Sequence, residues 1–194
     1  MKRLLIIVVA IFALVMSQEL NAVAGVGGAN IPLFTLAGGY ASTVQGSLAV
    51  CLNSYTYAYE SCTTPGALVV PLTYLAAGQI TWDFLGNACG SFTQVQSDLP
   101  VDAHQPQVSP TIIVGKLLNY SSATGGGDES FTAYSGGSCN GPVFNGTGAT
   151  VVSTGTDHFV VSGRGSRLDG IFTSLTDASS AIGDFSISFF DLKQ

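Results

Sequence analysis

The chain has 194 residues, of which 46% are hydrophobic, and a formal net charge of −6 from 6 basic and 12 acidic side chains. The apolar content, which includes eleven Phe, is sufficient for a folded core and excludes an intrinsically disordered chain. The acidic balance, without any basic stripe, argues against binding to nucleic acid or to anionic membrane surfaces, because their phosphates would be repelled.

The N-terminal segment has the three parts of a secretory signal peptide. Lys2 and Arg3 precede an apolar run over residues 4–16, and Ala22-Val23-Ala24 offers a cleavage site. As a helix this run would rise about 20 Å, less than the roughly 30 Å core of a bilayer, which favours a cleaved signal over a retained anchor. We therefore predict cleavage after Ala24, export to the periplasm or outside the cell, and one domain over residues 25–194. Cleavage would remove two basic residues and one acidic residue, which changes the net charge from −6 to −7.

Beyond the signal, the chain is predicted to form strands, because β-branched and aromatic residues cluster in short runs bounded by turn residues. The clearest run is 79–84, where Ile80, Trp82 and Phe84 alternate with polar residues as in a half-buried antiparallel strand. A turn at 85–87 and a returning strand over 88–96 complete a hairpin. In chain order, the other predicted strands cover residues 40–52, 69–75, 111–120, 130–134, 149–153, 158–162, 167–175 and 184–189.

This strand count favours an all-β fold, an antiparallel up-and-down barrel of about eight strands, with a β-sandwich as the alternative. Residues 125–129, which include the acidic pair Asp128-Glu129, are predicted to be a solvated loop. Residues 99–110, with His104, are predicted to be an irregular connection, and Asp157 is predicted to end a turn over 154–156.

Four cysteines lie in the predicted exported domain, at positions 51, 62, 89 and 139. An even number in an exported chain favours two disulfides, for which three connectivities are possible. We favour Cys51–Cys62 and Cys89–Cys139, because the first pair bounds one short Tyr-rich segment. No C-x-x-C pair occurs and neither histidine lies near a cysteine, so we predict no metal site and no cofactor.

Two motifs resemble those of a known group of proteins. Leu36-Ala37-Gly38-Gly39-Tyr40 opens the first predicted strand, and residues 78–87 read G-x-I-T-W-D-x-x-G-N. The chain thereby resembles a group of small exported bacterial proteins with the layout L-x-G-x-Y and G-x-I-T-F-D-G-x-G-N. It departs from them where Trp82 replaces Phe and Phe84-Leu85 replaces Gly-x. The resemblance implies a calycin-like or allene-oxide-cyclase-like barrel, and it implies no activity because that group has none established.

The candidate ligand-binding residues are aromatic or belong to a rare charged cluster. Tyr55, Tyr57 and Tyr59 recur at a period of two, which predicts an aromatic row on one strand face that could stack sugars or a partner surface. The alternative is half-buried packing. Arg167 and Asp169 would share a strand face, either as an exposed ion pair or as a fork for a carboxylate ligand.

The sequence offers less support for catalytic residues than for ligand-binding ones. Asp157 and His158 are adjacent, so on a strand they would point to opposite faces and could not pair directly. His104 is interpreted as a solvated loop histidine.

Three functions follow from these patterns. The first is a non-enzymatic binding barrel for a small apolar or aromatic ligand, or for an extracellular or envelope surface, with Ile80, Trp82 and Phe84 lining its interior. The second is a barrel isomerase or cyclase, which needs a polar group inside the barrel; the candidates are Asp83, Arg167 and Asp169. The third is an eight-stranded outer-membrane barrel, although the chain ends in Asp191-Leu192-Lys193-Gln194 rather than in an aromatic residue.

Overall fold

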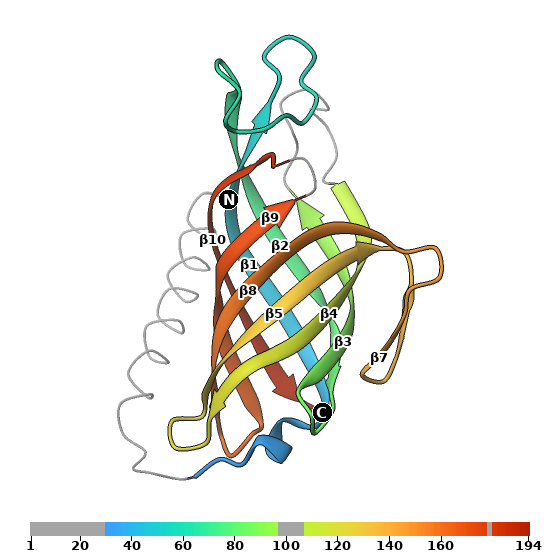
Figure 1. Cartoon of the computed structure of the whole chain (residues 1–194), viewed down its shortest axis with the longest axis vertical. Helices are drawn as coiled ribbons and strands as arrows, with labels where there is room; N and C mark the ends of the chain where they lie inside the picture. The colour runs from blue at the N-terminus through green and yellow to red at the C-terminus, as the bar shows by residue number, and fades with distance from the viewer. Residues whose placement is uncertain (1–29, 97–106, 178–179) are drawn as a thin grey trace, which may run out of the picture.

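The computed structural model of the protein describes residues 30–96, 107–177 and 180–194. It is a closed barrel of eight antiparallel strands in the order β1-β10-β9-β8-β5-β4-β3-β2, beside a separate β6–β7 hairpin (Figure 1). The predicted all-β barrel is therefore confirmed. The signal segment, its cleavage site and His104 lie outside the described residues. The elements are η1 Leu33–Leu36, β1 Gly38–Leu52, β2 Leu68–Trp82, β3 Asn87–Gln96, β4 Gln107–Ser121, β5 Gly126–Ser135, β6 Ser138–Asn140, β7 Val143–Asn145, β8 Thr150–Ser162, β9 Arg167–Asp177 and β10 Ile182–Lys193.

Several predicted strands are longer than the sequence pattern indicated. The hairpin over 79–96 is confirmed as the β2–β3 pair. The strand predicted over 69–75 belongs to β2, and those predicted over 149–153 and 158–162 are both parts of β8. Three predictions are wrong: residues 126–129 lie in β5 rather than in a loop, residues 107–110 lie in β4 rather than in an irregular connection, and Asp157 lies inside β8 rather than at a turn. Glu129 and Asp157 are direct ladder partners, so the paired strands continue through both sites.

The turn between β2 and β3 corrects one expected lining residue. Asp83 Oδ1 accepts hydrogen bonds from the backbone N–H groups of Leu85 and Asn87, each at 2.8 Å, and this ends the strand at Trp82. Phe84 therefore lies in the turn with 66% of its surface exposed, outside the interior where it was predicted. Ile80 and Trp82 are buried, as the alternation predicted.

One end of the barrel is closed by η1 (Figure 1). Leu36 is completely buried, and the hydroxyl of Tyr40 donates to the carbonyls of Leu36 at 2.9 Å and Gly165 at 3.1 Å. Lys193 Nζ donates to the carbonyl of Thr35 at 2.8 Å. These bonds join η1 to β1 and to the end of β10, and they join β1 to the β8–β9 turn, so η1 acts as a fixed plug.

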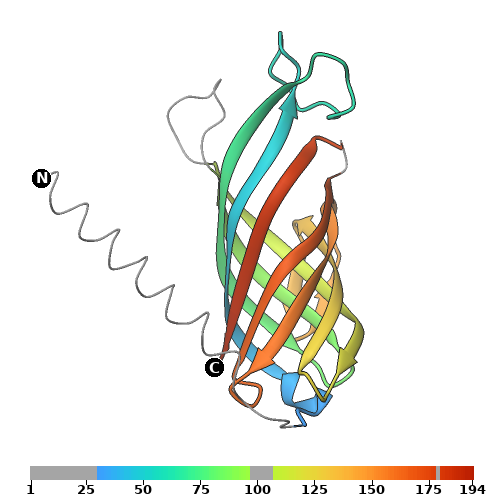
Figure 2. The same cartoon turned by 90° about the vertical axis from the view of Figure 1, so that its left-hand side faces the viewer.

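At the opposite end, β1 and β2 rise past the other strands (Figure 2). The Cys51–Cys62 disulfide ties the loop between them to the end of β1. The second disulfide, Cys89–Cys139, attaches the β6–β7 hairpin to β3 on the outside of the barrel. Both predicted pairings are confirmed.

The barrel wall is interrupted between β9 and β10. Their ladder pairs Arg167 with Leu192 and continues to Ile171 with Ser188. Continuing this register would place residues 172–177 opposite 182–187, yet these segments form no ladder pair in the described sheet. We call this interruption the slit. The Asp177 carboxylate accepts a hydrogen bond at 3.2 Å from the N–H of Ile182 and so bridges its upper end.

A β-bulge gives the slit a physical cause. The β8–β9 register shifts between Thr156 and Asp157, which leaves Thr173 as the extra residue of β9. The Thr156 hydroxyl lies 2.8 Å from the hydroxyls of both Thr173 and Ser174, which fixes the bulge in place. Because a bulge bends its strand and increases the local twist, β9 turns away from β10 just beyond the last ladder pair.

Candidate ligand cavity inside the barrel

Three carboxyl groups point into the barrel from three different strands. Glu129 on β5, Asp157 on β8 and Asp191 on β10 are 4%, 3% and 3% exposed. We call them the carboxyl cluster. A methyl group at Gly115 would overlap the Glu129 carboxylate, so the glycine of the neighbouring strand provides the space that this side chain occupies. Asp191 lies opposite Ser42 of β1 in the ladder.

Burial without basic partners changes the acidity of the cluster. Burial raises the pKa of Glu129 well above its usual range, and the negative charges of Asp157 and Asp191 raise it further. Burial and the charge of Asp191 raise the pKa of Asp157 to about 8. Burial raises the pKa of Asp191 to about 7, although the Ser42 hydroxyl acts in the opposite direction. At neutral pH the cluster therefore retains protons.

The cluster lines a small interior cavity of about 30 Å³. Aromatic rings supply much of its wall: Trp82, Phe92, Phe131, Phe172 and Phe189. Three buried polar atoms of the lining have no hydrogen-bond partner, namely Trp82 Nε1, Asp157 Oδ1 and Asp191 Oδ1. Buried polar atoms are nearly always paired in native proteins, so this concentration in one cavity calls for an occupant. The cavity has room for about two groups the size of water.

A larger groove of about 700 Å³ lies where β9 and β10 separate. Its walls include Ile171 and Phe172 of β9, and Phe185 and Ile187 of β10, together with residues of β1 and β2. Phe172 lines both this groove and the interior cavity. Its ring also lies 4.7 Å from that of Phe131, between centroids, and 6.2 Å from that of Phe189. Phe172 therefore separates the slit from the carboxyl cluster.

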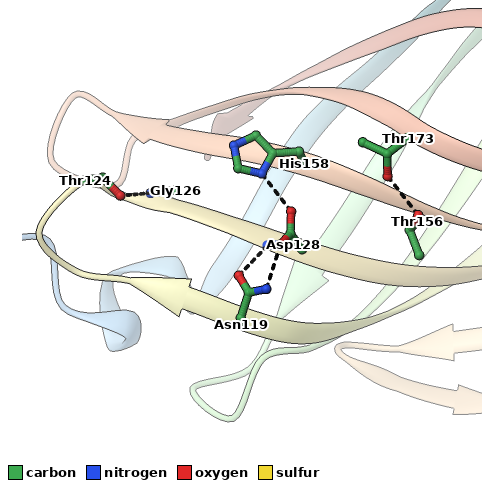
Figure 3. Close-up of polar contacts among 7 residues, drawn as sticks. All are labelled: Asn119, Thr124, Gly126, Asp128, Thr156, His158 and Thr173. Carbon is green, nitrogen blue, oxygen red and sulfur yellow. Dashed lines mark hydrogen bonds and ion pairs between the residues drawn. The ribbon is translucent and has the colours of Figure 1, made fainter.

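A second polar group lies on the outside of the barrel (Figure 3). His158 Nδ1 lies 2.7 Å from Asp128 Oδ1, and Asn119 Nδ2 donates to Asp128 Oδ2 at 2.6 Å. The hydrogen bond with His158 lowers the pKa of Asp128. The prediction that Asp157 and His158 face opposite sides is confirmed, because Asp157 is interior and His158 is exposed. Within the described chain no hydroxyl or thiol is bonded to His158, so this group lacks a nucleophile and fits a surface ion pair.

The predicted site residues have different outcomes. Trp82 lies in the cavity wall. Arg167 and Asp169 form an ion pair at 2.7 Å on the outer face, as one alternative predicted. Tyr55, Tyr57 and Tyr59 are exposed, but the predicted strand row is wrong. Asn53 Oδ1 accepts from the N–H groups at positions 55 and 56, which bends this segment into a turn, and Tyr57 has a φ of 57°.

The isomerase hypothesis named the wrong residues for its interior polar group. Asp83 caps a turn and the Arg167–Asp169 pair is exterior, so none of the three lies inside. The carboxyl cluster and Ser42 are inside instead, and sequence reasoning missed them. The signal was available: each acid alternates with apolar residues on one strand face, in Glu129-x-Phe131-x-Ala133, Asp157-x-Phe159-x-Val161 and Ile187-x-Phe189-x-Asp191.

Neither metal ligation nor a spanning helix is evident in the described part of the chain. No group of three or more His, Cys, Asp or Glu side chains there could hold a metal ion. None of the helices in these ranges has the length and apolar character to cross a membrane. No protein-family model matches the chain, and no curated protein and no solved structure matches it either.

Proposed function

We propose that this protein is an exported, non-enzymatic barrel that binds one small molecule with an apolar or aromatic body. The observation that carries this proposal is the set of three unpartnered polar atoms facing one aromatic-walled cavity. Sites for small molecules typically combine apolar walls with a few convergent polar groups, and this interior has both.

The slit supports a route to that cavity. The groove at the slit provides apolar surface for the body of a ligand, and Phe172 is shared between groove and cavity. A rotation of the Phe172 side chain would connect the two volumes without unfolding any strand, since residues 172–177 carry no ladder pairs to β10.

Export is the proposed location. The two disulfides are compatible with an oxidising compartment, and the N-terminal sequence has the plan of a signal peptide. Membership of the calycin-like group stays a prediction that rests on the two sequence motifs.

An acid–base isomerase is the second candidate. It is favoured by the pKa values of Asp157, about 8, and Asp191, about 7, because a general acid or base works best with a pKa near the working pH. Binding is the better-supported function, because a cavity of about 30 Å³ can take the head group of a ligand whose body lies in the groove, but not a whole substrate.

Fluorescence of Trp82 tests the binding function directly, because it is the only tryptophan of the chain. The probe is N-phenyl-1-naphthylamine, a neutral aromatic molecule. We expect saturable one-to-one binding with energy transfer from Trp82. Because the Phe172 ring lines both groove and cavity, we expect the loss of its contact surface in Phe172→Ala to outweigh easier entry and to weaken binding at least tenfold. Phe84→Ala, at an exposed Phe outside the site, is the matched control. Absence of saturable binding, or equal affinity of the Phe172→Ala protein, would overturn the proposed function.

A further inference from the structure

The interior of the barrel holds a set of negative groups without a counter-charge. Glu129, Asp157 and Asp191 all line the cavity, and no Lys, Arg or His from the described residues lines it with them. An isolated buried carboxylate is costly, and a protein either keeps it protonated or pairs it with a cation. A ligand that brings a positive charge would therefore complete this site.

The unpartnered atoms define the hydrogen bonds that such a ligand would make. Asp157 Oδ1 and Asp191 Oδ1 have no hydrogen-bond partner, and once their acids are ionised both can accept from an ammonium group, which carries three donors. Trp82 Nε1 is a buried donor without an acceptor, on a side chain only 3% exposed. Pairing the acids with a cation keeps them ionised and gives their unpartnered oxygens a donor.

The cavity walls and size narrow the class of cation. Trp82, Phe131, Phe172 and Phe189 line the cavity, and aromatic rings attract positive charge to their faces through the ring quadrupole. About 30 Å³ accommodates an ammonium group and its adjoining carbon, but not the bulk of a trimethylammonium group. Anionic head groups are disfavoured by both the carboxyl cluster and the ring faces.

We propose, building on the proposed function, that the interior cavity is the recognition site for an aliphatic primary amine. Its ammonium group binds Asp157 and Asp191 beside Trp82, and its hydrocarbon chain passes Phe172 into the groove at the slit.

The test compares probes that share one chain and differ only in the head group. Octylamine, 1-octanol, octanoate and octyltrimethylammonium are titrated at neutral pH, with Trp82 emission and displacement of N-phenyl-1-naphthylamine as readouts. We expect octylamine to bind at least tenfold more tightly than each of the other three. Equal binding of octanol and octylamine would overturn the amine assignment while leaving the proposed function intact, whereas failure of all probes, including the naphthylamine, would overturn both.

Near-isosteric variants distinguish the contribution of the carboxyl cluster to amine binding from the effect of removing any negative charge. Asp157→Asn and Asp191→Asn are each expected to weaken octylamine binding at least tenfold and to weaken 1-octanol binding by a much smaller factor. Asp184→Asn, which makes the same substitution at an exposed position of β10, is the matched control and should leave octylamine binding unchanged. Unchanged octylamine binding in both interior variants would contradict the assignment.

Proton release gives a readout that does not depend on variants. The groups that face the ligand are Glu129, Asp157 and Asp191; Asp128, Asp169 and Tyr40 interact with them electrostatically. Because the interior acids retain protons when the cavity holds no cation, binding of an ammonium group at pH 6 should release them. Calorimetry in two buffers of different ionisation enthalpy should therefore detect proton release with octylamine and none with 1-octanol. Equal release with both probes would overturn the proposal.

Discussion

Buried acids without basic partners give this protein an unusual dependence of stability on pH. For Asp191 the pKa is about 7 in the folded protein, against an ordinary value of 3.8. Between these values the folded state holds more protons than the unfolded state, so the free energy of unfolding decreases as pH rises. The stabilisation is complete below about pH 4 and is lost as pH rises through 7. At about 1.36 kcal/mol per pKa unit, the contribution of Asp191 to the free energy of unfolding changes by on the order of 4 kcal/mol over this pH range.

Substitution of one acid should remove part of this dependence. We expect urea unfolding of the wild type to give a lower free energy at pH 8 than at pH 5. In Asp191→Asn the difference between the free energies of unfolding at pH 5 and pH 8 should shrink. At pH 8 the variant should be more stable than the wild type, because the buried amide stays uncharged whereas the carboxyl group ionises. Asp184→Asn should follow the wild-type curve. A wild-type stability that rises from pH 5 to pH 8 would contradict this expectation.

Tyr40 illustrates how one hydroxyl joins the plug to the barrel. It is completely buried, and its O–H group lies within bonding distance of the carbonyls of Leu36 and Gly165. Tyr40→Phe leaves both buried carbonyls without this donor, so we expect a loss of roughly 1–2 kcal/mol in urea unfolding. Tyr55→Phe, at a side chain 90% exposed, should change stability by less than about 0.5 kcal/mol. Equal losses in the two variants would rule out this role for the Tyr40 hydroxyl.

At the scale of elements, the close approach of β2 to β3 depends on Gly78. A Cβ atom there would lie 2.1 Å from the backbone oxygen of Ser91, which cannot move without shifting β3. A Cβ at Gly39, in β1, would meet nothing within 4 Å. We expect Gly78→Ala to destabilise the barrel by roughly 1–3 kcal/mol and Gly39→Ala to have little effect, measured by urea unfolding. If Gly78→Ala left the free energy of unfolding unchanged, β3 would have to shift and make room for the added methyl group.

The elements also show what the sequence could predict. Alternation over 79–84 and turn residues at 85–87 predicted the β2–β3 hairpin, because both signals are local. The sequence did not predict the carboxyl cluster, because Glu129 was placed in a loop, Asp157 at a turn, and Asp191 beyond the strand predicted over 184–189. No strand face was therefore expected to carry these acids. The slit could not be predicted, since the bulge at Thr173 is a property of the register between two strands rather than of either sequence.

At the scale of the whole molecule, the two disulfides differ in what they hold. Cys89–Cys139 ties an exterior hairpin to β3, far along the sheet order from the slit. Cys51–Cys62 lies beside the segment that leads into β10: the N–H of Cys51 donates to the carbonyl of Ala181 at 2.8 Å, and the N–H of Cys62 donates to that of Ser180 at 3.1 Å. The latter disulfide therefore supports the upper end of the slit.

Removal of the two disulfides, one at a time, should therefore have different effects on ligand affinity, although each removal lowers stability. Chain entropy assigns about 3 kcal/mol to the Cys51–Cys62 loop and about 4 kcal/mol to the longer Cys89–Cys139 loop. We expect Cys89→Ala/Cys139→Ala to lower the free energy of unfolding without changing the affinity for N-phenyl-1-naphthylamine. Cys51→Ala/Cys62→Ala should lower both, because it releases the chain that borders the slit. Urea unfolding and probe titration measure the two effects. If the Cys89→Ala/Cys139→Ala protein loses affinity while the other double variant retains it, the ligand does not enter between β9 and β10.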